Sequence, residues 1–280
     1  MRWEGRAGSG NIEDRRGRRM GMALPVGGGI GGLVLLLLFS ALTGTSPTDL
    51  INTGEPDTAG TTGSTFEDDR EAQFVSVVLK HTEDTWKQIF RERGGTYQPP
   101  VLVLFTQATQ SACGIGQSAM GPFYCPSDRK VYLDLSFFHD LATRFGAPGD
   151  FAAAYVVAHE VGHHVQALTG VSERVQGARA GAGEREGNAL SVRMELQADC
   201  YAGVWGHYGA RTDLLEPGDA EEGLRAAAAI GDDRLQRQSQ GHVVPESFTH
   251  GSSAERMEWL RRGLDRGDPE ACDTFNAGTF

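Results

Sequence analysis

Positively charged residues are scarce in this chain of 280 residues. Its 26 lysines and arginines stand against 37 aspartates and glutamates, and the formal net charge is −11. A nucleic-acid-binding protein normally carries a basic stripe, so this balance excludes nucleic acid as an expected partner. The length suits one substantial globular domain with accessory segments, and no internal repeat is evident.

Cysteine is scarce as well. The four cysteines are Cys113, Cys125, Cys200 and Cys272, and none lies in a CxxC pair, which gives little support to a cysteine zinc site or a thioredoxin-like motif. Two disulfides would form in an oxidising compartment, and four buried free thiols are the alternative. Three pairings are possible. Proximity in the sequence favours Cys113–Cys125, which leaves Cys200–Cys272 as the second pair.

Charge is absent between Arg19 and Asp49, where residues 23–42 form an apolar stretch. Its length of about 20 residues is what a bilayer-spanning helix needs, so we expect a single transmembrane anchor there. Arginines crowd the preceding segment, and the positive-inside rule then predicts that residues 1–22 are a cytoplasmic basic tail. The remainder of the chain would be extracytoplasmic. A cleavable signal peptide, cut near residues 40–45, is the alternative, and it exports the same domain.

Beyond the apolar stretch, residues 43–66 are rich in Thr, Gly, Ser, Pro and Asp and read as a flexible linker. Residues 67–280 carry apolar residues at helical and strand spacing, which predicts one α+β domain, mainly helical with a small β-sheet. The region 172–189 is ambiguous and is expected to be a loop. Expected strands are 101–105 and 130–135; expected helices are 74–93, 136–145, 150–168, 192–208, 220–238 and 253–264.

The helix expected at 150–168 contains a candidate metal-binding motif, His159-Glu160-Val161-Gly162-His163. Histidines four residues apart lie on one face of a helix, so both imidazoles can reach one metal ion. Glu160 stands beside that face, where its carboxylate can accept a proton from an activated water. The alternative for so short a motif is that both histidines are hydrogen-bonded structural residues that bind no metal.

A third metal ligand decides between these readings, because catalytic zinc sites usually have three protein ligands and an open fourth position. Glu195 is the candidate, in the segment Met194-Glu-Leu-Gln-Ala-Asp-Cys200. Asp199 lies one helical turn further on the same face. It could accept a hydrogen bond from the second nitrogen of a ligand histidine and so fix the orientation of that ring.

These two segments, HEVGHH and ELQAD, resemble the gluzincin pattern, in which a glutamate of an E-x-x-A-D segment completes the metal site. A closer resemblance, covering nearly the whole expected domain, is to the neutral zinc metallopeptidases of bacteria. It rests on the segments starting at Phe123, Val131, His159, Glu195 and Phe248 and extending through Asp273-Thr-Phe. The resemblance implies a zincin-like fold with an N-terminal membrane segment, one Zn²⁺ per chain held by His159, His163 and Glu195, and Glu160 as general base.

The resemblance also implies a role for His250. In related gluzincins, a histidine before a helix that carries an arginine helps to polarise the scissile carbonyl. Here His250 precedes the expected helix 253–264, which contains Arg256, so it is a candidate for stabilising the oxyanion. A loop or capping histidine is the alternative, and His-Gly replaces the His-Pro of the prenyl-protease relatives.

The expected activity is therefore hydrolysis of peptide bonds in a peptide or protein substrate, without a covalent intermediate. Two other classes stay open: a zinc hydrolase that acts on a non-peptide amide of the cell envelope, and a membrane-tethered binding or assembly protein with a structural zinc. A structural site would be closed by a fourth protein ligand, and the sequence offers none beside the three. Oligomeric state is not indicated.

Overall fold

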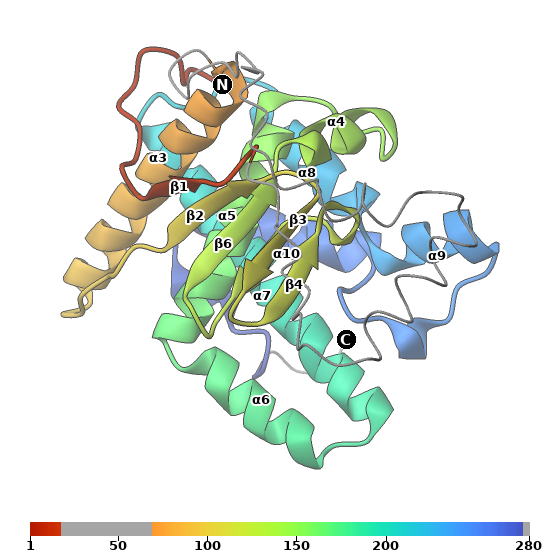
Figure 1. Cartoon of the computed structure of the whole chain (residues 1–280). Helices are drawn as coiled ribbons and strands as arrows, with labels where there is room; N and C mark the ends of the chain where they lie inside the picture. The colour runs from red at the N-terminus through yellow and green to blue at the C-terminus, as the bar shows by residue number, and fades with distance from the viewer. Residues whose placement is uncertain (18–68, 277–280) are drawn as a thin grey trace, which may run out of the picture. The chain divides into compact units, whose positions relative to one another are not determined.

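A four-stranded sheet has at its centre the two apolar strands that the sequence predicted. β2 (Val101–Phe105) and β6 (Lys130–Asp134) run parallel, and β5 (Phe123–Cys125) pairs antiparallel with β6 at one edge. β1 (Ile12–Asp14) lies parallel to β2 at the other edge, which gives the order β1-β2-β6-β5 (Figure 1). The computed structural model describes residues 1–17 and 69–276.

The first 17 residues belong to the same compact unit as the domain, which differs from the expected separate tail. Besides β1, Trp3 is buried and meets Phe74 edge to face, with ring centroids 5.4 Å apart. Asn11 and Ser9 donate hydrogen bonds to the buried carboxylate of Glu83 at 2.7 and 2.6 Å. A three-residue strand is too short to show periodicity, which is why the sequence did not reveal it.

The expected anchor, residues 23–42, and the expected linker, residues 43–66, lie outside the described residues. Among the helices that the structure does describe, none is both long enough and apolar enough for a bilayer crossing. Two of the arginines that suggested a membrane flank are paired with neighbouring carboxylates. Arg15 binds Glu13 at 2.8 Å and Arg16 binds Asp14 at 2.6 Å.

A small hairpin and eight α-helices surround the sheet in the described part of the chain, so the expected α+β class with a mainly helical domain is confirmed. The hairpin consists of β3 (Ala108–Ser111) and β4 (Gly114–Gln117). The helices are α3 (Arg70–Glu92), α4 (Ser136–Thr143), α5 (Asp150–Leu168), α6 (Val171–Gly181), α7 (Glu184–Arg211), α8 (Asp219–Ala229), α9 (Asp232–Gln240) and α10 (Ser253–Arg266), with short 3₁₀ turns η2 (Ser118–Met120), η3 (Pro245–Ser247) and η4 (Pro269–Cys272).

α5 is the buried centre of the helical layer and lies behind the sheet, beside α7, in Figure 1. Its residues are buried along almost the whole length, so its histidines and Glu160 are held by packing on all sides. The helix spans the expected residues 150–168: Gly149 is the N-cap, and Asp150 is the first helical residue. The Asp150 carboxylate accepts the indole N–H of Trp3 at 3.0 Å, which ties the N-terminal segment to this helix.

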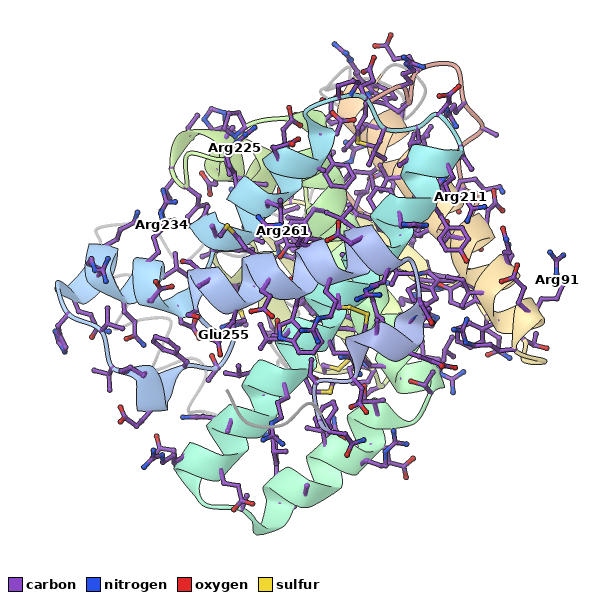
Figure 2. All side chains as sticks on the ribbon, turned by 180° about the vertical axis from the view of Figure 1, so that it is seen from behind. Arg91, Arg211, Arg225, Arg234, Glu255 and Arg261 are labelled. Carbon is purple, nitrogen blue, oxygen red and sulfur yellow. A yellow bond between two sulfur atoms is a disulfide. The ribbon has the colours of Figure 1, made fainter. Side chains whose placement is uncertain are left out.

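Gly162 allows α5 and α7 to approach closely. A Cβ atom at this position would lie 2.9 Å from the carbonyl oxygen of Ala198, so only glycine fits without displacing a backbone. α10 packs across α7 and α8 and occupies the foreground of Figure 2, where Arg261 is labelled on its exposed side.

Two helical segments differ from the sequence expectation. The region 172–189, expected to be a loop, forms α6 and the first turn of α7. The single helix expected at 220–238 is two helices, interrupted at Ile230-Gly231. A Cβ at Gly231 would lie 2.4 Å from the backbone nitrogen of Ser253, so the break permits α10 to begin against this turn.

Both preferred disulfides are confirmed. Cys113–Cys125 connects the end of the small hairpin loop to the edge strand β5, and Cys200–Cys272 connects α7 to the C-terminal turn η4. No described cysteine is free. The second disulfide closes a loop of 72 residues that includes α8, α9 and α10, so it constrains the unfolded chain strongly.

Candidate metal centre

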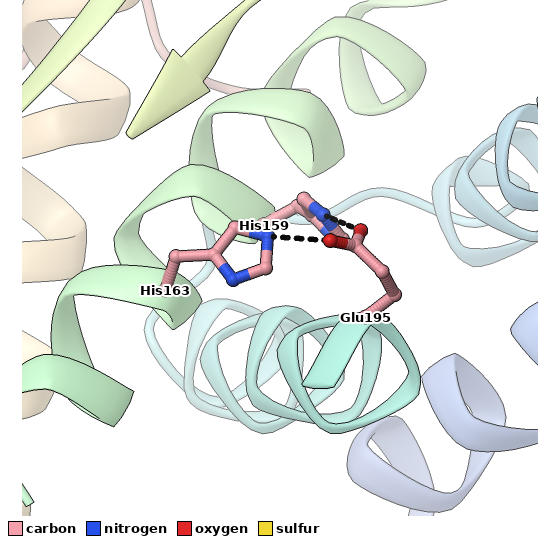
Figure 3. Close-up of side chains that lie close together, drawn as sticks. All are labelled: His159, His163 and Glu195. Carbon is pink, nitrogen blue, oxygen red and sulfur yellow. Dashed lines mark hydrogen bonds and ion pairs between the residues drawn. The ribbon is translucent and has the colours of Figure 1, made fainter. Parts of the chain in front are cut away.

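α5 and α7 bring the three expected metal ligands together. His159 and His163 project from successive turns of α5 toward Glu195 of α7, as Figure 3 shows. The His159 Nε2 atom lies 3.2 Å from Glu195 Oε2, and the His163 Nε2 atom lies 3.4 Å from Glu195 Oε1. All the candidate donor atoms lie within 4.8 Å of one another.

The spacing of these atoms fits a zinc ion. Zinc bonds of about 2.0–2.2 Å to nitrogen and oxygen place neighbouring ligands of a tetrahedron roughly 3.3–3.6 Å apart. The two histidine–glutamate separations, 3.2 and 3.4 Å, are close to that range. Within residues 1–17 and 69–276 the metal-capable group comprises these three side chains alone, as in zinc sites that keep a fourth position for water or substrate.

The second nitrogen of each imidazole is occupied. His159 Nδ1 lies 2.8 Å from Asp199 Oδ1, the carboxylate that the sequence placed on the same face as Glu195. His163 Nδ1 lies 2.9 Å from the side-chain oxygen of Gln166, a partner that sequence reasoning missed. Because each Nδ1 meets an acceptor, each ring donates its proton there, and Nε2, which faces Glu195, is the nitrogen available to bind a metal ion.

Asp199 is itself held by three further hydrogen bonds. The Arg256 guanidinium donates to both of its oxygens, at 2.8 and 3.0 Å, and the Tyr155 hydroxyl donates at 2.5 Å. Burial alone would raise the pKa of Asp199, but the charges of Arg256 and His159 lower it to about 2. The carboxylate is therefore ionised at neutral pH, and Arg256 balances its charge.

The centre has the electrostatics of a cation site. Burial favours the neutral form of His163, but the negative charge of Glu195 raises the pKa of this histidine. Asp199 and Glu195 raise the pKa of His159 in the same way. The pKa of Glu195 falls well below its ordinary value despite burial, because the two imidazoles face it. Burial raises the pKa of the neighbouring Glu160. Carboxylates that favour a charged imidazole favour a bound metal cation for the same reason.

The three candidate ligands and Glu160 line a cavity of about 580 Å³. Its walls come from β5 and the preceding loop, from α4 and the turn after it, from α6 and from α9, so the segment expected to be a loop contributes a helical wall. Large apolar and aromatic side chains dominate these walls. They include Met120, Phe123, Tyr124, Phe137, Phe145 and Leu235.

His250, the other expected catalytic residue, lines the same cavity from the loop before α10, and its side chain is 52% exposed. Asp232, the first residue of α9, organises this loop. Its Oδ2 accepts the backbone N–H groups of Thr249 and His250 at 2.7 Å each, and its Oδ1 lies 3.2 Å from His250 Nδ1. The Asp232 hydrogen bond raises the pKa of His250. Sequence reasoning placed His250 near the site but did not find Asp232.

A helix with the HExxH motif, packed on a helix that supplies a glutamate, defines the class of the zinc-binding HExxH proteins. Within that class, the chain belongs to the family described as "Putative neutral zinc metallopeptidase", whose model matches residues 1–275. The family description implies bound zinc and peptidase activity.

Two relatives illustrate the extent of the similarity. "Uncharacterized protein YpfJ" of Escherichia coli (strain K12) is 52% identical over 284 residues, covering 98% of this chain and 99% of the relative. "Uncharacterized protein Rv2575" of Mycobacterium tuberculosis (strain ATCC 25618 / H37Rv) is 44% identical over 217 residues, covering 73% and 72%. No solved structure matches the chain significantly.

Proposed function

We propose that the protein is a zinc-dependent peptidase that hydrolyses peptide bonds with Glu160 as general base. The observation that supports this most directly is the separation of the Glu195 carboxylate from the two imidazoles, 3.2 and 3.4 Å, at the wall of an open cavity. A zinc ion held by these residues would supply Lewis-acid chemistry, polarising a carbonyl and lowering the pKa of water to about 7.

Other side chains of the cavity would transfer the proton and stabilise the oxyanion. The Glu160 carboxylate accepts the proton of the attacking water and passes it to the nitrogen of the leaving amine. His250 donates a hydrogen bond to the oxyanion that develops on the scissile carbonyl, and Asp232 holds it at the cavity rim. Apolar and aromatic walls of this extent suit a peptide segment better than a small amide.

Membrane attachment through residues 23–42 and a location outside the cytoplasm are also proposals. The two disulfides support the second of them, because disulfides persist in oxidising compartments and are rare in the cytosol.

The test compares bound zinc and cleavage of an unstructured protein such as casein in the purified full chain. We expect about one zinc per wild-type chain, strong depletion in His163→Ala and Glu195→Ala, and retained zinc with abolished turnover in Glu160→Gln. His242→Ala, an exposed histidine that does not line the cavity, is the matched control and should keep both properties.

His250→Ala should keep its zinc and lower kcat by about 10²–10³-fold, as loss of one oxyanion donor typically does. Wild-type turnover in Glu160→Gln would show that Glu160 is not the general base. Stoichiometric zinc with no cleavage of casein or peptides would point instead to a non-peptide amide substrate or to a structural metal.

A further inference from the structure

Gln166 is the partner of the ligand histidine His163, and its amide can be oriented in one way only. Its Nε2 atom lies 2.7 Å from the carbonyl oxygen of Met194 and 3.1 Å from Oε1 of Gln197. Two acceptors on that side require the NH₂ group there, so the amide oxygen must face His163. The histidine therefore has to donate from Nδ1, and its Nε2 is left free to bind a cation.

Gln197 continues the chain of hydrogen bonds. Its Nε2 donates to the backbone carbonyl of Cys272 at 3.0 Å, which leaves its Oε1 to accept from Gln166. The donors thus point in one direction, from His163 through Gln166 and Gln197 to Cys272, and hydrogen bonds in series polarise one another. Gln166 is 0% exposed and Gln197 is 5% exposed, so water does not compete for these groups.

The residue at the end of this series of hydrogen bonds is fixed by a disulfide. Cys272 is completely buried and is bonded to Cys200, the residue that follows Asp199 in α7. The C-terminal turn η4 is thereby attached to the helix that carries Glu195 and Asp199. The partners of the two imidazoles also differ in charge: Asp199 is an ionised carboxylate balanced by Arg256, whereas Gln166 fixes its histidine without adding a second negative charge.

We propose that Gln166 and Gln197 are positioning residues that fix His163 for metal binding, and that the C-terminal turn at Cys272 acts on the metal centre through them. This inference rests on the proposed zinc site. Within the described residues, neither glutamine hydrogen-bonds the Glu195 carboxylate, so His163 is the ligand side chain on which they act.

The experiment measures the zinc dissociation constant of the metal-free full chain by titration against a competing chromophoric chelator. Methionine has nearly the shape of glutamine but neither donates nor accepts strongly, so the variants are Gln166→Met, Gln197→Met and the double variant. Gln88→Met, on the exposed face of α3, is the matched control. The absorption spectrum of the Co²⁺-loaded protein reports the geometry at the metal independently.

We expect Gln166→Met to weaken zinc binding about 10–100-fold, the usual cost of removing such a partner. Gln197→Met should weaken it less, and the double variant should bind no more weakly than Gln166→Met, because Gln197 acts through Gln166. The Co²⁺ spectrum should change in all three variants and not in the control.

Wild-type zinc affinity in Gln166→Met, or losses that multiply in the double variant, would overturn the proposal. If Gln166→Met does not fold, the test is made with Gln197→Met. An unchanged zinc affinity and an unchanged Co²⁺ spectrum in Gln197→Met would likewise overturn the proposal. A wild-type chain that binds no zinc would instead overturn the zinc site, whereas loss of zinc in Glu195→Ala but not in Gln166→Met would overturn only the role of the glutamines.

Discussion

At the scale of single residues, hydrogen-bond partners decide which protonation state a buried side chain keeps. Asp199 stays charged in the interior because it accepts four hydrogen bonds from three side chains: His159, Tyr155 and Arg256. His81 shows the opposite outcome. Its Nδ1 atom is buried and has no hydrogen-bond partner among the described residues, and the ring meets Trp205 edge to face with centroids 5.9 Å apart. Burial, with a smaller contribution from Arg6, lowers the pKa of His81 to about 4.

That shift predicts a pH-dependent stability. Because the folded-state pKa lies below the ordinary value of 6.5, the unfolded chain binds the proton more tightly. The contribution of neutral His81 is therefore complete above pH 6.5 and is lost as the pH falls toward 4. We expect the free energy of unfolding, measured with urea, to fall between pH 7 and pH 5 by about 2 kcal/mol more in the wild type than in His81→Gln. Parallel pH profiles for the two proteins would contradict this.

How far the site could be predicted also depends on distance along the chain. Spacing within one helix indicated His159 with His163, and Glu195 with Asp199, because residues four apart share a face. Tyr155 and Arg256 reach Asp199 across sequence separations of 44 and 57 residues, and no local pattern encodes such contacts. Gln166 lies only three residues after His163 on the same helix. Glutamine at that spacing is common in helices, so the sequence did not single it out.

At the scale of elements, glycine sets how closely the helices of the site approach. Gly203 of α7 faces α10: a Cβ atom there would lie 2.2 Å from the carbonyl oxygen of Leu260 and 2.9 Å from Cα of Gly263. Backbone thus meets backbone at this crossing. α10 carries Arg256, so the spacing of the two helices also determines whether its guanidinium reaches Asp199.

Gly203→Ala should therefore force α10 away from α7. We expect the free energy of unfolding to fall by about 1–3 kcal/mol or more, and zinc affinity to fall with it. Gly177→Ala in α6 is the matched control, because no atom of the described residues lies within 4 Å of its Cβ position. That change should stabilise the protein by about 0.5–1 kcal/mol, as alanine loses less entropy in a helix. Similar urea midpoints for the two variants would argue against a backbone contact at Gly203.

The elements themselves followed the sequence where apolar or helix-forming residues make a continuous run. α5 was expected at 150–168 and spans those residues, and the strand at 101–105 is β2. The predictions were wrong where the sequence shows little apolar periodicity or where a distant contact ends a helix. α6 is rich in glycine and arginine, and its exposed surface leaves only Val171 and Val175 buried, so almost no apolar period is visible. The break at Gly231 results from contact with Ser253, which is remote in sequence.

At the scale of the whole molecule, the N-terminal segment is structural. It pairs with the edge of β2, covers Phe74 and satisfies the buried Glu83 carboxylate. A chain that begins at residue 67 should therefore unfold more readily and aggregate, because it exposes a strand edge and removes the hydrogen bonds of Ser9 and Asn11 to the buried Glu83 carboxylate.

We expect a peptide of residues 1–17, added in trans, to raise the melting temperature of that shortened chain, whereas a scrambled peptide of the same composition should not. Calorimetry of both mixtures and of the full chain provides the measurement. A shortened chain as stable as the full chain would show that β1 is dispensable.

The parallel pairing of β1 with β2 also constrains the route of the chain across a membrane. Residues 1–17 and 69–276 form one folded unit, so they must occupy the same compartment. A single crossing within residues 23–42 would leave them on opposite sides of the bilayer. A protein attached to a bilayer through residues 23–42 would therefore have to keep both described ranges on the same side of it. The basic N-terminus would then share a compartment with the metal centre, and a count of positive charges at one end of the apolar stretch would not report the side on which the protein works.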